Sequence, residues 1–196
     1  MKALIGLLLS ASLLGCPQQK QAQDLPETPP SAVATDTPIA AQNQKILLEN
    51  KTRHAFSDPS REDLFQLVLI GDDLLKAEVH FTIQDPAGQE IYQDTFPSRD
   101  LLGYGLMENS QNPTDDDRKT YIQQRVARFF EPASFLQPAI PDKAVFDAEM
   151  YNKEAWDLIH NNPKSIGFFY LTGEENGRSL VYSPVQKKAI VYLNCC

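Results

Sequence analysis

Residues 77–96 read AEVHFTIQDPAGQEIYQDTF, and this stretch decides the predicted fold. In its first half every second residue from position 77 to 83 is apolar, which is the period of a strand with one buried face. The sequence Asp-Pro-Ala-Gly at 85–88 places proline and glycine where a tight turn needs them. Residues 89–96 are therefore expected to return as the antiparallel partner strand.

Further strands are predicted on both sides of this hairpin. Residues 64–70 form an apolar run broken only by Gln66, which indicates a well-buried strand, and a Gly-Asp-Asp turn follows it. Near the other end of the chain, three strands are predicted at the ranges 165–172, 178–183 and 189–195. The sequence thus predicts two antiparallel three-stranded meanders.

Two helices are predicted between the meanders. Thr114 can cap the first one, and the three aspartates that follow it suit the positive end of the helix dipole. Its apolar face carries four residues at helical spacing, Ile122, Val126, Phe129 and Phe130. A second helix is expected over 147–160, with Tyr151, Ala155, Leu158 and Ile159 directed inward.

These elements indicate an α+β domain in which a two-helix middle is flanked by the two meanders. A single sheet with helices on one face is the first expectation. A sandwich or barrel decorated with helices is the alternative.

The N-terminal segment has the pattern of a targeting signal. Lys2 precedes an apolar stretch over 3–14, which is long enough for a signal peptide and too short to span a bilayer. The stretch ends in Leu-Leu-Gly-Cys at 13–16, which resembles the lipobox of bacterial lipoproteins. An ordinary secretory signal that happens to contain cysteine is the alternative reading.

The resemblance implies cleavage before Cys16, so that residues 1–15 are a signal peptide. It also implies that Cys16 carries a diacylglycerol and a further acyl chain such as palmitate. Two or more acyl chains make a stable membrane anchor. Pro17 stands where an aspartate in this family would favour retention in the inner membrane. We therefore expect a cell-envelope protein in the outer membrane that faces the periplasm.

Composition divides the rest of the chain into two parts. Residues 16–44 hold the lipidated cysteine and a stretch rich in Pro, Gln and Ala without aromatic residues, which is typical of a disordered tether. All 18 aromatic residues lie at or after Phe56, so residues 45–196 are expected to form a single globular domain. The net charge of −8 makes nucleic acid an improbable partner.

The C-terminal pair Cys195-Cys196 is unusual in an oxidising compartment. Adjacent Cα atoms lie about 3.8 Å apart, below the usual ~4.4 Å lower limit for bridged cysteines. A strained redox-active disulfide, an intermolecular bridge or a soft-metal site at these two residues are the functional readings. The simpler one is a small buried residue beside an exposed thiol.

An apolar loop over 101–107 is the candidate interface, with Leu102, Tyr104 and Leu106 as its contact residues. Loops are usually polar, so this one is either a lip beside a groove or a segment folded back onto the core.

Short catalytic motifs are missing from the sequence: there is no Gly-x-Ser-x-Gly, phosphate loop or Cys-x-x-Cys, and the three histidines lack metal-site spacing. No cofactor is expected, and no catalytic or metal residue is assigned. The sequence favours a non-enzymatic module that binds an envelope protein or polymer. A hydrolase with a site assembled from distant residues is one alternative, and a thiol or metal function at the C-terminal cysteines is another.

Overall fold

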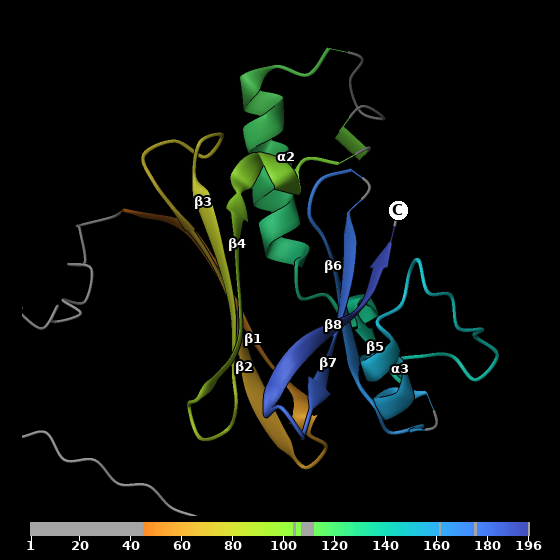
Figure 1. The fold of residues 1–196 in the computed structure, drawn as a ribbon. Coiled ribbons are helices and arrows are strands. Elements are labelled where there is room, and N and C mark those ends of the chain that lie inside the picture. The colour runs from red at the N-terminus through yellow and green to blue at the C-terminus, as the bar shows by residue number, and fades with distance from the viewer. Residues whose placement is uncertain (1–44, 104, 107–111, 161, 175, 196) are drawn as a thin grey trace, which may run out of the picture. The chain divides into compact units, whose positions relative to one another are not determined.

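The structure is a computed structural model, and it describes residues 45–103, 105–106, 112–160, 162–174 and 176–195 (Figure 1). Eight strands form two antiparallel sheets, each with its strands in chain order. Sheet A contains β1 (Ile46–Asp58), β2 (Arg61–Ile70), β3 (Glu78–Gln84) and β4 (Glu90–Pro97). Sheet B contains β5 (Phe135–Leu136), β6 (Gly167–Leu171), β7 (Gly177–Ser183) and β8 (Lys188–Cys195).

Two α-helices and two short 3₁₀ helices complete the named elements of the described residues. These are η1 (Ser98–Leu101), α2 (Asp115–Arg128), η2 (Pro132–Ser134) and α3 (Lys153–Ile159). The α+β class is confirmed. The prediction of three-stranded meanders in one sheet is wrong, because each meander gains a strand and the two sheets are separate.

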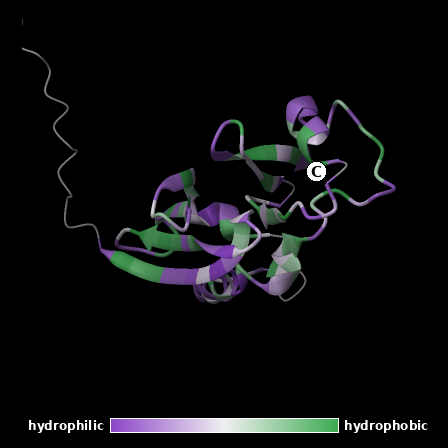
Figure 2. Ribbon diagram, turned by 90° about the horizontal axis from the view of Figure 1, so that it is seen from below, coloured by the Kyte–Doolittle hydropathy of each residue, from purple (hydrophilic) through white to green (hydrophobic). Residues whose placement is uncertain are grey.

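The predicted hairpin of β3 and β4 is confirmed. Gly88 has a φ of 85°, the left-handed conformation that glycine adopts most easily, and its N–H donates to the carbonyl of Asp85. The Asp85 carboxylate also accepts the backbone N–H groups of Ala87 and Gln89. Figure 2 shows hydrophobic and hydrophilic residues in the same strands, and along β3 buried residues alternate with half-buried or exposed ones.

The main core lies between the facing sides of the two sheets. Phe65 and Phe81 of sheet A are fully buried, and their ring centroids lie 5.2 and 5.5 Å from that of Phe168 in sheet B. β2 buries Phe65, Leu67 and Leu69 on this side, whereas its other side is only partly covered. The apolar run over 64–70 is therefore buried on one face rather than on both.

Helix α2 lies between the upper parts of the two sheets in Figure 1. Its start is confirmed by a capping box, in which the Thr114 hydroxyl accepts from the Asp117 N–H and the Asp117 carboxylate accepts from the Thr114 N–H. All four predicted inward residues, from Ile122 to Phe130, are buried.

Helix α3 is shorter than predicted, and it begins after the Asn152 cap. Residues just before it bond to β8 instead: the Asn152 N–H donates to the Tyr192 carbonyl, and the Asn194 N–H donates to the Met150 carbonyl. These strand-edge bonds replace the first helical turns. α3 covers the outer face of sheet B, where Trp156 and Ile159 pack with Tyr192 in a second core.

Candidate functional site

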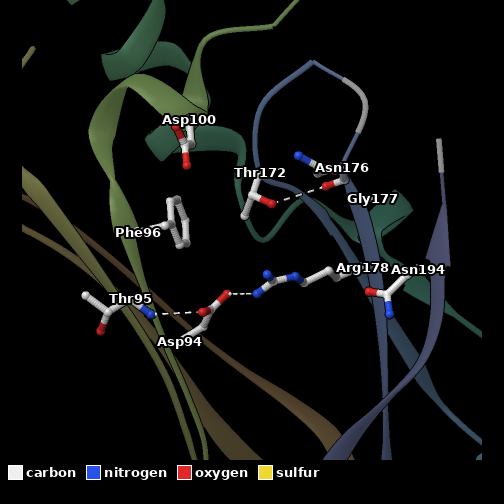
Figure 3. A pocket seen from close by; sticks show the side chains of 9 residues that line it. All are labelled: Asp94, Thr95, Phe96, Asp100, Thr172, Asn176, Gly177, Arg178 and Asn194. Carbon is white, nitrogen blue, oxygen red and sulfur yellow. Dashed lines mark hydrogen bonds and ion pairs between the residues drawn. The ribbon is translucent and has the colours of Figure 1, made fainter. Parts of the chain in front are cut away.

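A pocket of about 430 Å³ opens where β4 of sheet A approaches β7 and β8 of sheet B. Both sheets contribute to its wall, as does η1. All but two of its lining side chains are polar (Figure 3). The lining residues are Asp94, Thr95, Phe96, Asp100, Thr172, Asn176, Gly177, Arg178 and Asn194.

The carboxylate of Asp94 joins the two sheets at the base of this pocket. Its Oδ2 accepts a hydrogen bond of 2.7 Å from the Tyr170 hydroxyl and another of 2.7 Å from Arg178 Nη1. Because the Tyr170 proton is committed to Asp94, Tyr92 must donate in the 2.6 Å contact between the two tyrosine hydroxyls. We refer to Tyr92, Asp94, Tyr170 and Arg178 as the polar junction.

Register explains why these charges meet. Asp94 pairs with Phe81 in sheet A, and Arg178 pairs with Tyr170 in sheet B, so both charged residues lie on the core-facing sides of their sheets. A charge on a buried face needs a partner to be tolerated. The side chain of Asp94 is 16% exposed and that of Arg178 is 39% exposed, because the pair lies at the margin of the core.

The tyrosines of the polar junction remain protonated. Burial raises the pKa of Tyr170 far above its usual range, and the neighbouring Tyr92 and Asp94 add to this effect. Burial likewise raises the pKa of Tyr92. Both phenols therefore keep their protons at neutral pH, and Tyr170 uses its proton to hold the Asp94 carboxylate.

Asp100 and the β6–β7 turn form the pocket's rim. The carbonyl of Asp100 accepts from the Gly173 N–H, which ties η1 to this turn. Gly173 has a φ of 85°, and the N–H of Thr172 donates to the Asn176 carbonyl at 2.8 Å, so the turn is closed on itself. The Asp100 side chain is partly exposed, and in Figure 3 its carboxylate lies on the pocket side of η1.

The candidate interface loop starts at Leu101, the last residue of η1, and so adjoins this rim. Leu102 is half-buried and packs against the main core, and Leu106 is buried with 7% exposure. Tyr104 lies outside the described residues. The described part of the loop is thus folded onto the core, and its role as an interface stays a prediction.

The other candidate residues lie at or beyond the edges of the described chain. Cys16 belongs to residues 1–44, which are not described. Cys195 is the last residue of β8 and pairs with Gly177 of the pocket wall, while Cys196 falls outside the description. In the part of the chain that the structure describes, no group of three or more His, Cys, Asp or Glu residues is placed to hold a metal ion.

The three histidines lie apart from one another and do not line the pocket. His54 stacks on Phe135 with ring centroids 3.8 Å apart, and His160 stacks on Trp156 at 4.7 Å. His80 lies 2.6 Å from a Glu78 oxygen on the outer face of sheet A.

Sequence reasoning missed the residues that form the pocket. One signal for Asp94 was present, since it lies two positions from both Tyr92 and Phe96 and so shares their face of the strand. A carboxylate between two aromatic residues on one face of a strand indicates a buried partner. Its identity as Arg178 could not be read from the sequence, because that residue belongs to the other sheet.

No helix among the described residues is long and apolar enough to cross a membrane. Comparisons with protein-family models, with curated proteins and with solved structures found no match to this chain.

Proposed function

We propose that the protein is a bacterial envelope lipoprotein whose globular domain binds a protein or a polymer of the envelope without catalysing a reaction. The lipobox at 13–16 and the tether that follows support the anchor at acylated Cys16. Pro17 supports a position in the outer membrane, facing the periplasm. In this proposal the acyl chains hold the protein to the bilayer, and the domain reaches its partner through the tether.

The pocket between the sheets is the observation that carries the binding function. Its carboxylates, guanidinium and amides supply hydrogen-bond donors and acceptors at one place, and the Asp94–Arg178 bond fixes two of these groups before any ligand arrives. The adjoining loop with Leu102, Tyr104 and Leu106 extends the proposed contact surface.

Metabolic labelling tests the anchor. The full chain is produced in a bacterium grown with an alkyne analogue of palmitate, next to a Cys16→Ser variant. We expect label and membrane fractionation for the wild-type chain and loss of both in the variant. A Cys195→Ser/Cys196→Ser double variant is the matched control and should keep the label, since its thiols lie at the other end of the chain. Equal labelling of the Cys16→Ser variant would exclude lipidation at this residue.

Crosslinking in intact cells tests the binding function. Full-length protein that carries a photo-reactive residue at position 102 should give discrete adducts with envelope material. A Tyr104→Ser substitution should reduce these adducts if the loop takes part. Val145→Ser is the matched control, because Val145 is 81% exposed and belongs to a different loop. Equal adduct yields for both variants would remove the loop from the binding surface, and a complete absence of adducts would count against binding.

A further inference from the structure

We propose that the pocket between β4, β7 and β8 binds a neutral, hydroxyl-rich saccharide unit. This inference rests on the proposed function, because it names the ligand class of the same site. It is carried by the mixture of donors and acceptors in the lining, by their charges and by the single aromatic side chain among them.

The lining offers donors and acceptors in comparable measure. The guanidinium of Arg178 has five N–H groups, more than Asp94 and its neighbouring tyrosines can accept. The amides of Asn176 and Asn194 each carry both a donor and an acceptor, and Asp100 supplies a carboxylate that accepts only. A sugar hydroxyl donates and accepts at once, so adjacent hydroxyls on one ring can use both kinds of group.

Charge favours a neutral ligand over an ionic one. Asp94 and Arg178 neutralise each other at 2.7 Å, and Asp100 adds one more carboxylate to the lining, with Arg99 Nε 3.9 Å away on the outside. An anion would meet this carboxylate and the field of a chain with a net charge of −8. A cation would find Asp94 already engaged by Arg178, and would have only Asp100, whose side chain is 37% exposed and lies 3.9 Å from Arg99 Nε.

The aromatic side chain is Phe96, which lies between Asp94 and Asp100 in Figure 3. Phe96 is 7% exposed and belongs to the main core, so it forms the apolar side of the pocket wall. The C–H groups of a sugar ring can lie against this side while its hydroxyls reach the polar groups around it. Because Phe96 is the only large apolar residue of the lining, the pocket offers little to lipid chains or to apolar peptide side chains.

The site is held in shape without a ligand. Asp94 accepts from Tyr170 and from Arg178, so the guanidinium has lost much of its rotational freedom already. The rim is fixed in the same way by the bond from the Gly173 N–H to the Asp100 carbonyl. Pre-organised groups cost less entropy on binding, which permits measurable affinity for a small neutral ring. The volume of about 430 Å³ lies within the range of small-molecule pockets, roughly 300–1,000 Å³.

Titration with defined oligosaccharides tests the proposal. Full-length protein is titrated with neutral tetrasaccharides of N-acetylglucosamine, glucose and galactose, each up to about 10 mM, a range that covers weak binding. The side-chain amide signals of Asn176 and Asn194 are followed by nuclear magnetic resonance. We expect at least one neutral sugar to shift both signals. An acidic tetrasaccharide of alternating glucuronate and N-acetylglucosamine should bind at least tenfold more weakly than the best neutral one.

Two substitutions in the pocket lining locate the binding. Asp100→Asn and Asn194→Ala should each weaken the affinity about tenfold, the effect of losing one hydrogen bond to a desolvated partner. The Asp100 side chain is partly exposed and Asn194 is exposed, so neither change should unfold the domain. Asp142→Asn is the matched control, since it removes the same charge from an exposed position that does not line the pocket. It should leave the affinity unchanged.

Three results would overturn the inference: no amide shift with any neutral sugar, tighter binding of the acidic sugar, or shifts that Asp100→Asn leaves unchanged. If envelope crosslinks persist in cells while the sugars fail to bind, the saccharide assignment fails and the proposed function stands. Loss of both the crosslinks and sugar binding in the folded wild-type protein would remove the two together.

Discussion

The two sheets meet differently at their two margins. At one margin the polar junction joins Tyr92 and Asp94 of β4 to Tyr170 of β6 and Arg178 of β7. Where β1 lies near β5, His54 stacks on Phe135, whose ring lies 5.2 Å from that of Phe65. We call these three rings the aromatic junction.

The aromatic junction only stabilises the fold, whereas the polar junction also contributes to a pocket. Contacts between rings depend on complementary shape and on the exclusion of water. The aromatic junction therefore calls for no hydrogen-bond partner from outside the protein. Hydrogen bonds are directional, and a guanidinium at the margin retains donors after its partner is satisfied. The polar junction therefore joins the sheets and also forms the base of a pocket.

The largest effect is expected at Phe168, whose ring contacts residues of both junctions. Its fully buried ring contacts Phe65 and Phe135 on one side and Tyr170 on the other. Phe168→Ala should lower the free energy of unfolding by about 3–5 kcal/mol, since it removes a large side chain from a packed core. Urea denaturation measures this loss. A cost below 1 kcal/mol would mean that the sheets do not depend on a common core.

Asp94→Ala comes next and tests the polar junction alone. It leaves Arg178 and Tyr170 without their acceptor and should cost about 1–3 kcal/mol, a range reduced for the partial exposure of the pair. The cost should shrink when the ionic strength is raised. Denaturation in low and in high salt provides the check, with Asp142→Asn as the exposed control. Equal costs in both salts would argue against an electrostatic role for Asp94.

Tyr170→Phe should cost about 1–2 kcal/mol at neutral pH, because it removes the bond donated to Asp94 and the bond accepted from Tyr92. It should also change the response to alkali. Tyrosines of the unfolded chain ionise near pH 10, whereas the raised pKa of Tyr170 keeps it protonated in the folded chain, so wild-type stability falls as the pH rises above about 10.

The Tyr170→Phe variant lacks this proton and should lose stability less steeply above pH 10. Tyr192, whose pKa burial raises to about 12, contributes in both proteins and cancels in the comparison. Urea midpoints between about pH 8 and 12 give the two slopes. Parallel curves would show that Tyr170 ionises as freely in the folded chain as in the unfolded one.

The smallest effect is expected at His54. His54→Ala removes one stacked ring from the aromatic junction and should cost about 0.5–1.5 kcal/mol. This cost should be insensitive to salt, in contrast to that of Asp94→Ala. Thermal unfolding of the two variants across a salt series compares the margins directly, and a strong salt dependence for His54→Ala would contradict the distinction between them.

Local patterns predicted the elements that local contacts stabilise. The β3–β4 hairpin follows from alternation and from the glycine of its turn, and the start of α2 follows from Thr114 and its reciprocal bond with Asp117. β1 was missed because its apolar residues lie near its two ends, with six polar residues at 49–54 between them. β5 has only two residues, too few for any pattern.

The remaining differences come from contacts between distant parts of the chain. Residues 150–152 bond to the edge of β8, so α3 begins later than its sequence suggests. Asp94 and Arg178 are 84 residues apart, and only the packing of one sheet on the other brings them together. The candidate site was therefore not predictable from the sequence, although the presence of Asp94 on an apolar face was a visible signal.

The chain-order arrangement of both sheets bears on how the protein is made. Sheet A ends at Pro97, whereas Phe168 of sheet B follows 71 residues later in the chain. Sheet A pairs only neighbouring strands, so it has the local contacts that form quickly. Until sheet B has formed, the core-facing side of sheet A leaves Phe65 and Phe81 uncovered. The newly made chain is most prone to aggregation in this interval, and a fragment truncated after sheet A should be retained by chaperones that bind exposed aromatic surface.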